Sequence, residues 1–267
     1  MKIAVSEIFK SIQGEGRFSG EPSIFVRTIG CNLRCVFKDS MCDTPYTSFN
    51  PEKPLYTSTE DVVKEIKRVI GNDPVYHIVF TGGEPLLFKD AIGEIISELH
   101  SESDDYVITI ETNGTVEPIE NCHVDLYSIS PKLSTSVDWN CKYLSEQQRD
   151  DHNKKRINIE NLFNIIATGS YQLKYVYSGQ ESVDEIKYII DELDRYACQL
   201  ADKKIRKEDV ELYWLDHPSF NTMLMPEGTV NDQLNNISNE CAEACIKNGW
   251  RFCDRLHIRI WGDKRGV

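Results

Sequence analysis

Apolar, strand-like runs alternate with amphipathic, helix-like segments along the whole chain, and this alternation restricts the possible folds more than any other feature. The patterns predict strands at residues 5–12, 23–28, 77–80, 106–110, 124–129, 171–177, 211–215, 222–225 and 255–261. They predict helices at 59–66, with Thr59 as N-cap, and at 90–100, 183–200 and 230–248, the last ending at Gly249. Because strand–helix–strand units cross over with one hand, we expect an α/β fold with a parallel sheet and outer helices.

One segment does not fit the alternation. Residues 134–156 are polar and lack a clear period, which indicates a long insertion. No linker divides the chain, so we expect a single domain over residues 1–267. Three roles are open for the insertion: it covers the mouth of a barrel, packs at a dimer interface, or does neither.

Composition and charge limit the class of protein. Of the 267 residues, 40% are hydrophobic and 27% charged, which is typical of a packed globular protein. The net charge of -13 argues against nucleic acid, which binds basic surfaces, and favours a small-molecule substrate. No apolar run reaches the roughly 18 residues of a membrane span, and residues 1–7 are too polar for a signal peptide. We therefore expect a cytoplasmic protein whose nine cysteines are thiols or metal ligands rather than disulfides.

Four polar or cysteine-bearing segments directly follow predicted strands. They are the cysteine loop at 30–44, the turns at 81–85 and 111–114, and the tripeptide at 130–132. The carboxyl ends of parallel strands meet at one edge of a sheet or one mouth of a barrel. The sequence therefore predicts one functional site where these four segments come together.

Three cysteines, Cys31, Cys35 and Cys42, fall within twelve residues of that loop. Three thiolates are one short of a closed zinc site or a fully protein-ligated iron–sulfur cube. The plainer interpretations are a structural zinc site or thiols packed in a core, but no fourth zinc ligand is obvious nearby. We favour an iron–sulfur cluster with one open position, because such a cluster explains the count of three.

A strand, a cysteine loop and then a Gly-Gly-Glu-Pro turn resemble the radical S-adenosylmethionine (SAM) superfamily. The resemblance implies a partial (β/α) barrel in which the three cysteines hold a 4Fe-4S cluster. It also implies that the unique iron binds SAM, which electron transfer then cleaves to a 5′-deoxyadenosyl radical. The spacing departs from the superfamily pattern, since Lys38 stands where the third cysteine ordinarily falls. Residues 38–41 look like a four-residue insertion, which leaves Cys42 as the third ligand.

The same resemblance implies residues that contact SAM. The turn at Gly83 and Glu84 would hold the methionyl end, since glycine admits close backbone approach and a carboxylate pairs with an ammonium group. For any single residue of the set, the plainer interpretation is a turn, a cap or an ordinary strand residue. The full set is Met41, Asp43, Gly83, Glu84, Ser130, Pro131, Lys132, Gln172, Lys174 and Tyr175.

The N-terminal stretch narrows the resemblance. Residues 7–16 and 25–35 closely resemble the 7-carboxy-7-deazaguanine synthase family, as do residues 225–228 and the tail at 261–267. The family converts 6-carboxy-5,6,7,8-tetrahydropterin to 7-carboxy-7-deazaguanine with loss of ammonia, in 7-deazapurine (queuosine-type) biosynthesis. The resemblance implies a homodimer and a reductant such as flavodoxin or ferredoxin.

The family resemblance also implies the contacts of the carboxypterin substrate. Arg27 suits its carboxylate because a guanidinium binds bidentately; the plainer alternative is a salt bridge at a strand end. The resemblance implies Mg2+ at the Thr44 hydroxyl, bridging to that carboxylate, whereas a turn cap is the plainer role. The substrate residues implied are Ile12, Gln13, Gly14, Glu15, Arg27 and Thr81.

Two other functions share parts of this pattern. A radical SAM activase that acts on a partner protein would use the cysteine loop, but it would not need Arg27 and the turn at 13–15. A zinc-binding protein without enzymatic activity would need only the thiols. The synthase interpretation uses all three features.

The C-terminal cysteines offer a possible auxiliary cluster. Cys241 and Cys245 lie at i and i+4 on one predicted helix, with Cys253 eight residues further. The same spacing suits a buried helix face, where free cysteine packs as a small hydrophobe, and we predict packing. We interpret Cys122, Cys141 and Cys198 in the same way. His257, in a predicted strand near the C-terminus, is open to two interpretations, a pocket residue or a core histidine, and we expect the core histidine.

Overall fold

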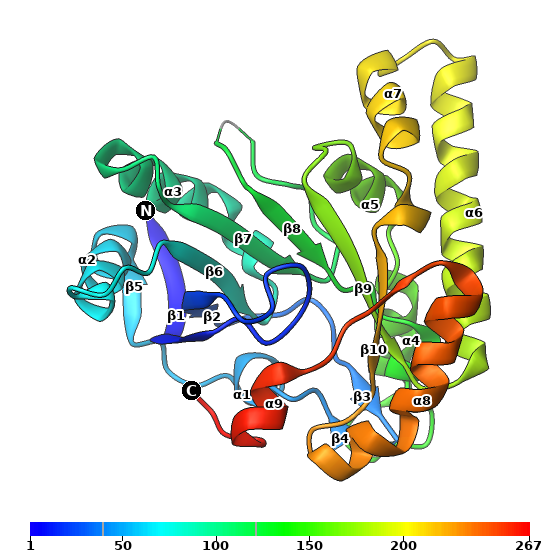
Figure 1. Cartoon of the computed structure of the whole chain (residues 1–267), viewed down its shortest axis with the longest axis horizontal. Helices are drawn as coiled ribbons and strands as arrows, with labels where there is room; N and C mark the ends of the chain where they lie inside the picture. Colours follow the sequence, from blue (N-terminus) through cyan, green and yellow to red (C-terminus); the bar gives the residue numbers. More distant parts are fainter. Residues whose placement is uncertain (39, 121) are drawn as a thin grey trace.

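A nine-stranded sheet forms the centre of the computed structural model, which describes residues 1–38, 40–120 and 122–267 (Figure 1). From edge to edge the strand order is β11-β10-β9-β8-β7-β6-β2-β1-β5. These strands are β1 (Lys2–Ile12), β2 (Pro22–Thr28), β5 (Tyr56–Ser58), β6 (His77–Gly82), β7 (Val107–Thr112), β8 (Leu126–Ile129), β9 (Tyr171–Tyr177), β10 (Thr222–Pro226) and β11 (Arg251–Phe252). A separate hairpin consists of β3 (Val36–Phe37) and β4 (Ser40–Met41).

Most of the sheet is parallel. From β2 through β6 to β11, each strand pairs parallel with the next, as expected for strand–helix units wound in one direction. β1 and β5 instead add antiparallel at one edge. The architecture is a partial (β/α) barrel, and the predicted fold class is confirmed.

The helices pack on this sheet through one continuous hydrophobic core. Its buried members include Ile78 and Phe80 of β6, Ile92 and Ile96 of α3, and Leu193 of α6. Each buried side chain of this kind contributes about 1.5–3 kcal/mol, so the core holds the helices against the strands. The helices are α1 (Pro45–Ser48), α2 (Thr59–Ile70), α3 (Lys89–Glu102), α4 (Glu146–Lys155), α5 (Ile159–Ile166), α6 (Gln180–Asp202), α7 (Lys207–Leu215), α8 (Asn231–Asn248) and α9 (Leu256–Trp261).

Residues 211–215 lie in α7, so the strand prediction there was wrong. The aromatic side chains of Tyr213 and Trp214 favour strands. However, Glu208 and Asp209 stand in the first turn of α7, where acidic side chains stabilise a helix. The buried Tyr213 also stacks near Phe163 of α5 at 5.4 Å between ring centres. Tertiary packing therefore outweighs the local preference.

Residues 255–261 were also predicted as a strand, but they form α9. Apolar and polar residues alternate here as in a half-buried strand, yet Ile258 alone is buried in this helix. Arg259 pairs with Asp254 at 3.1 Å, which fixes the chain at the start of the helix. Smaller differences are found elsewhere in the chain. α5 was not predicted. The N-cap of α2 is Ser58 rather than Thr59.

The predicted insertion at 134–156 contains regular structure. It begins with a 3-10 turn at Ser134–Ser136 and ends with α4. Ser145 and Gln148 form a capping box at the N-terminus of α4. α4 is polar on all sides, which is why no helical period was visible in the sequence. Val137 bridges to Val36 of the cysteine hairpin, so the insertion packs beside the cysteine loop.

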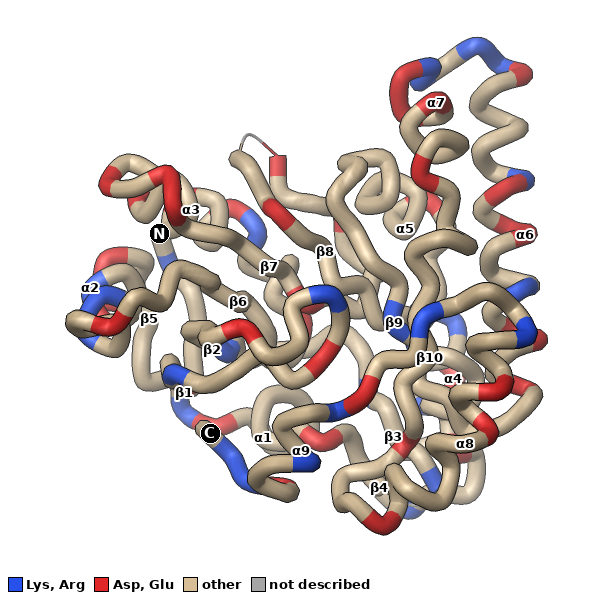
Figure 2. The backbone as a smooth tube through the Cα atoms, viewed as in Figure 1, with Lys and Arg blue, Asp and Glu red and all other residues tan. Residues whose placement is uncertain are grey.

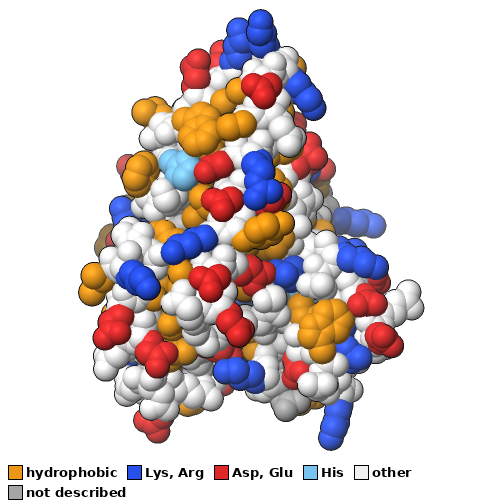
Figure 3. All heavy atoms as spheres, turned by 90° about the vertical axis from the view of Figure 1, so that its right-hand side faces the viewer, with side chains coloured by type: hydrophobic (Ala, Val, Ile, Leu, Met, Phe, Trp, Pro, Cys, Tyr) orange, Lys and Arg blue, Asp and Glu red, His pale blue; other side chains and the backbone are white. Residues whose placement is uncertain are grey.

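Residues of both charges are spread along the described chain (Figure 2). The face of α6 and α7 also carries apolar side chains among the charges (Figure 3). Trp214, Leu215 and Phe220 are exposed in this region. In the part of the chain that the structure describes, no helix is both long and apolar enough to cross a membrane.

His77 links three neighbouring strands of the sheet. Its Nδ1 lies 2.7 Å from Ser23 Oγ on β2, and its Nε2 lies 2.8 Å from Thr109 Oγ1 on β7. The Ser23 hydroxyl donates to the Glu21 carbonyl, so Nδ1–H donates to Ser23 and Nε2 accepts from Thr109. Burial lowers the pKa of His77 to about 4, and the neutral ring is therefore the folded form.

We expect His77 alone to reduce the free energy of unfolding by about 2 kcal/mol between about pH 7 and about pH 5. The unfolded side chain, with its ordinary pKa of 6.5, takes up a proton in this range, whereas the folded one stays neutral down to about pH 4. Urea unfolding of the wild type and His77→Gln at both pH values measures the difference. Equal pH dependence in the two proteins would contradict the assignment.

Candidate active site

A cavity of about 920 Å³ lies at the carboxyl ends of the parallel strands, within the size range of small-molecule sites. The β3–β4 hairpin, α1 and α9 lie together along the lower edge of the sheet in Figure 1 and contribute to its walls. The predicted site residues that line it are Ile12, Gln13, Gly14, Glu15, Arg27, Cys31, Cys35, Met41, Cys42, Asp43, Thr44, Thr81, Gly83, Ser130, Lys132 and Lys174.

Four residues predicted to contact SAM do not line the cavity. Tyr175 is fully buried, and its hydroxyl has no hydrogen-bond partner among the described residues. The side-chain oxygen of Gln172 accepts from the Arg17 N–H and its amide donates to Ser128 Oγ, both at 2.8 Å. These side chains therefore pack or form hydrogen bonds inside the protein and do not face the cavity. The four residues are Glu84, Pro131, Gln172 and Tyr175.

The turn after β6 packs directly against the start of the cysteine loop. A Cβ on Gly83 would lie 1.9 Å from the Gly30 carbonyl oxygen, so only glycine fits. The buried Glu84 carboxylate accepts from the Thr112 hydroxyl and the Asn113 N–H, both at 2.7 Å, and burial raises its pKa. Glu84 therefore joins the ends of β6 and β7, and its carboxylate is not placed to pair with an ammonium group in the cavity.

The chain between Cys35 and Cys42 forms an antiparallel hairpin. β3 pairs with β4, and the Cys42 N–H donates to the Cys35 carbonyl at 3.0 Å. The two cysteines are therefore cross-strand neighbours, although six residues separate them. The insertion predicted at 38–41 extends this hairpin without moving Cys42 away from Cys35; Asp39 within it lies outside the described residues.

The three thiols of the loop lie near the charge of Lys132; Cys35 is buried, and Cys31 and Cys42 are half-buried. Burial is the largest cause that raises the pKa of each thiol, to about 11 for Cys42, and the charge of Lys132 acts in the opposite direction on all three. No three Cys, His, Asp or Glu side chains meet in a ready-made metal site within the described residues. Three thiols of one loop that face one cavity still fit a cluster with an open position, which they would bind with loss of their protons.

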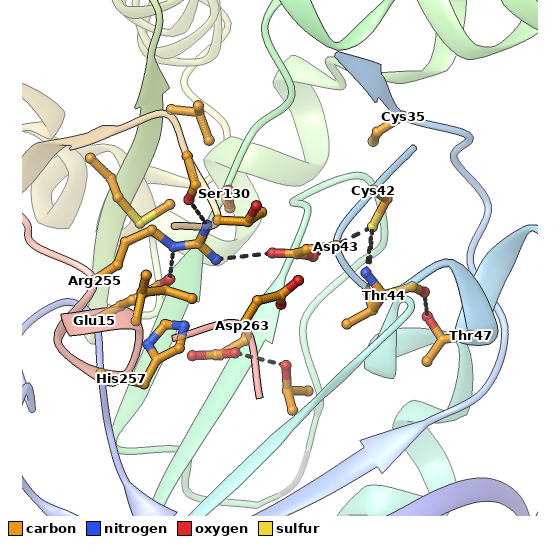
Figure 4. A pocket seen from close by; sticks show the side chains of 18 of the residues that line it. Glu15, Cys35, Cys42, Asp43, Thr44, Thr47, Ser130, Arg255, His257 and Asp263 are labelled. Carbon is orange, nitrogen blue, oxygen red and sulfur yellow. Dashed lines mark hydrogen bonds and ion pairs between the residues drawn. The ribbon is translucent and has the colours of Figure 1, made fainter. Parts of the chain in front are cut away.

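Arg255 joins two carboxylates across the cavity (Figure 4). Its guanidinium donates to Glu15 and to Asp43, each at 2.9 Å, and to the Gly228 carbonyl at 2.6 Å. Lys174 pairs with the second oxygen of Glu15. Burial opposes the charge on Glu15, but Lys174 and Arg255 outweigh it and hold the pKa of Glu15 well below its ordinary range. One network thus unites a residue predicted for the substrate with two predicted for SAM.

His257 is a pocket residue, and the expectation of a core histidine was wrong. A Cβ on Gly14 would lie 2.0 Å from its Nδ1, so the ring occupies space that only glycine at position 14 leaves free. Burial lowers the pKa of His257, while the charge of Glu15 acts against this. Figure 4 shows the ring beside Glu15.

Glu111 connects two residues predicted to contact substrate. Its carboxylate accepts from the Gln13 amide at 3.1 Å and from the Thr81 hydroxyl at 2.7 Å. The Gln13 side-chain oxygen in turn accepts from the Glu15 N–H at 3.1 Å. These bonds fix the N-terminal turn against the ends of β6 and β7.

Arg27 is held by Glu7 on the neighbouring strand. Its Nε donates to Glu7 at 2.6 Å, and its guanidinium lies 5.5 Å from the centre of the Phe9 ring. The other oxygen of Glu7 accepts from Arg265 at 2.9 Å, and Arg265 lies over the Tyr46 ring at 3.8 Å. The salt bridge considered as the plainer interpretation is present, and Arg27 nevertheless lines the cavity.

Thr44 stands at the N-cap position of α1, but its hydroxyl makes no capping hydrogen bond. Its Oγ1 lies 3.4 Å from Cys42 Sγ. The hydroxyl is therefore next to the third cysteine, at the wall of the cavity.

No individual role was predicted from the sequence for four charged residues of the site, although the turn that begins with Glu111 was predicted to lie there. They are Glu7, Glu111, Arg255 and Arg265. Glu111 offered a signal, because it is a charged residue at the end of a buried strand. Arg255 offered none, since it stands 240 positions from Glu15 along the chain. Contacts between such distant segments become visible only in the folded chain.

The C-terminal cysteines are buried. Cys241 and Cys245 belong to the main core, and Cys253 Sγ accepts from the Gly16 N–H at 3.0 Å. The predicted packing is confirmed for these three. Of the other cysteines, Cys141 is buried and Cys122 half-buried, but Cys198 is exposed, which corrects its assignment to the core.

Comparison with known proteins identifies relatives of this chain. Residues 25–168 match the radical SAM superfamily. The chain is 34% identical to a 7-carboxy-7-deazaguanine synthase from Halobacterium salinarum, covering 98% of this chain and 91% of that protein. It is 32% identical to another from Rhodopirellula baltica, covering 99% and 89%.

A solved structure shares the fold. The crystal structure of QueE from Escherichia coli matches with a TM-score of 0.60 and 23% identity, covering 96% of this chain and 95% of that one. The sequence relatives and the superfamily match together establish the family. The chain belongs to the 7-carboxy-7-deazaguanine synthase family of the radical SAM superfamily.

Proposed function

We propose that this protein is a radical SAM enzyme that converts 6-carboxy-5,6,7,8-tetrahydropterin to 7-carboxy-7-deazaguanine with loss of ammonia, in 7-deazapurine biosynthesis. The observation that carries the proposal is the meeting of the cysteine loop, the turn at 13–15 and Arg27 around one cavity. The relatives named for this activity span nearly the whole chain. A cavity of about 920 Å³ suits a small substrate better than the partner protein of an activase.

Membership of the radical SAM superfamily implies a 4Fe-4S cluster and SAM. We assign Cys31, Cys35 and Cys42 to the cluster, which with SAM supplies a 5′-deoxyadenosyl radical. Lys132, which donates to Ser130 Oγ at 2.9 Å, places a cation close to all three thiols. We assign the cavity-lining members of the predicted SAM set to SAM binding, and Asp43 and Lys174 also anchor the Arg255 network.

The substrate side of the cavity has the donors and acceptors that a carboxypterin needs. Arg27 would bind the carboxylate through two hydrogen bonds. Its contact with Glu7 uses only Nε, which leaves the rest of the guanidinium for the substrate. The ionised Glu15 would accept from N–H groups of the pterin, and the turn at 12–14 would offer backbone groups to its polar edge. Thr81, held by Glu111, would contact the substrate from β6.

We further propose Mg2+ at Thr44. A hard cation of this kind keeps several waters and takes few protein ligands, so one hydroxyl and the substrate carboxylate suffice to place it. The Thr44 hydroxyl supports this assignment, because it makes no capping hydrogen bond and stands at the wall of the cavity. The homodimer, the flavodoxin or ferredoxin reductant, the single domain and the cytoplasmic location stay predictions.

The direct test of the function is turnover. Reconstituted enzyme, incubated anaerobically with SAM, reductant, Mg2+ and 6-carboxy-5,6,7,8-tetrahydropterin, should yield the mass of 7-carboxy-7-deazaguanine. A protein that holds an intact cluster but forms no such product would refute the proposal.

Cys42→Ala should abolish cluster assembly, because two thiolates do not retain a cluster that needs three. Iron and sulfide counting after anaerobic reconstitution measures the effect. Cys198→Ala, at an exposed cysteine on α6, is the matched control and should bind iron as the wild type does. A full cluster in Cys42→Ala would remove Cys42 from the ligand set.

Arg27→Gln should lower kcat/KM for the carboxypterin by about 10- to 100-fold, the scale of one lost charge-assisted contact. The kcat/KM of Arg27→Lys should lie between those of the wild type and Arg27→Gln, since lysine keeps the charge but not the planar guanidinium group. Arg68→Gln, in an exposed ion pair on α2, is the control. Kinetics of Arg27→Gln equal to those of the wild type would place the carboxylate elsewhere.

Thr44→Val should raise the Mg2+ concentration needed for half-maximal activity, whereas Thr44→Ser should not, because serine keeps the hydroxyl. Steady-state rates over a series of Mg2+ concentrations measure this. Identical Mg2+ dependence in Thr44→Val and the wild type would exclude the Thr44 hydroxyl as a ligand.

A further inference from the structure

The segment at 134–156 makes its closest polar contact with the cysteine loop through one side chain. Of the ten residues of α4, only His152 is buried. Its Nδ1 accepts a hydrogen bond from the Arg34 N–H at 3.0 Å. A helix that is otherwise polar and exposed thus inserts a single histidine against the backbone between Cys31 and Cys35.

Both ring nitrogens of His152 have defined roles. Nε2 lies 3.0 Å from Ser136 Oγ, and the Ser136 hydroxyl donates to the Leu133 carbonyl at 2.7 Å. Nε2 must therefore carry the hydrogen and donate to Ser136, which leaves the Nδ1 lone pair for the Arg34 N–H. Burial is the main cause that lowers the pKa of His152 to about 4, which agrees with a neutral ring.

The contacted backbone is the part of the loop that carries the cysteines. Arg34 directly precedes Cys35, and its guanidinium donates to the carbonyls of Cys31 and Leu33 at 2.6 and 2.7 Å. Neither Arg34 nor His152 lines the cavity. The hydrogen bond to His152 therefore supports the loop from outside the cavity.

The same segment also holds the other side of Cys35. Val137 bridges to Val36, and the Asp138 N–H donates to the Val36 carbonyl at 3.1 Å. Val36 is fully buried in a small cluster with Cys141 and Leu144. Contacts from 134–156 thus flank Cys35 at both of its neighbours.

We propose that residues 134–156 preset the cysteine loop for its cluster, and that His152 is the positioning residue, acting through the Nδ1 bond to the Arg34 N–H. The inference rests on the proposed cluster site at Cys31, Cys35 and Cys42. It also assigns a role to the insertion, for which the sequence left a barrel cover, a dimer contact or neither. Outer-shell contacts that orient the ligands of a metal site affect metal affinity by about 10- to 100-fold, and the bond to the Arg34 N–H would orient Cys35 through the backbone.

Two amide variants distinguish the effect of the hydrogen bond from the effect of the volume of the ring. His152→Asn keeps an acceptor near the position of Nδ1, whereas His152→Gln moves its oxygen one bond further out. After anaerobic reconstitution of the full chain, iron per chain and the rate of iron release to a chelator are measured, with the EPR spectrum of the reduced cluster. We expect His152→Asn to match the wild type within about twofold, and His152→Gln to release iron about tenfold faster with an altered spectrum.

Gln148→Ala is the matched control, because it removes the capping box of α4 but leaves the contacts of His152. It should retain iron as the wild type does. Wild-type iron release in His152→Gln, equal loss in both His152 variants, or the same loss in Gln148→Ala would each overturn the proposal. If His152→Gln does not fold by far-UV circular dichroism, His152→Asn decides: retained iron supports the hydrogen bond and lost iron refutes it. Normal clusters without turnover of carboxypterin would count against the proposed function alone.

Discussion

The ion pairs of Arg255 hold together the parts of the chain that form the site. Arg255 follows the last strand of the sheet, Glu15 follows the first, and Asp43 adjoins the third cysteine. The side chains of Arg255 and Glu15 are both largely buried, and removing one partner from such a pair costs about 3–5 kcal/mol, because the other charge stays buried without compensation. Asp43 is half-exposed, so its pair with Arg255 contributes less. The geometry of the N-terminal turn and of the cysteine loop therefore depends on a residue near the opposite end of the chain.

The charges of this network balance. Glu15 and Asp43 are matched by Arg255 and Lys174, so the network presents no net charge to a ligand even though the chain carries a net charge of -13. Arg27, which shares the Glu7 carboxylate with Arg265, and Lys132 add two cationic groups to the wall of the cavity. An acidic protein thus retains a site that is suited to a carboxylate substrate and to a cluster held by thiolates.

Local features of the site were predictable from sequence, and long-range ones were not. The cysteine loop, the Gly-Gly turn and Arg27 lie at strand ends, and strand ends follow from short-range patterns. α7 and α9 were misassigned because aromatic and alternating residues favour strands until packing decides otherwise. Glu84 shows a third case: its position beside the cysteine loop was predicted, but its carboxylate is used by Thr112 and Asn113. The role of 134–156 was hidden because a polar helix with one buried histidine has no period to detect.

The β3–β4 hairpin has a consequence for how this loop can vary in length. Rungs of an antiparallel ladder alternate between hydrogen-bonded and non-hydrogen-bonded pairs, and each rung adds two residues. The Cys42 N–H donates to the Cys35 carbonyl, which is one of the two bonds of a hydrogen-bonded rung, and the residues that flank a tight two-residue turn form a rung of the same kind. If a Cys-x2-Cys turn lengthens by two rungs, it gains four residues, and its two cysteines again form a hydrogen-bonded pair. If it gains only two residues, the cysteines form a non-hydrogen-bonded pair. Such a hairpin therefore keeps the mutual orientation of the two sulfurs when it lengthens by four residues at a time.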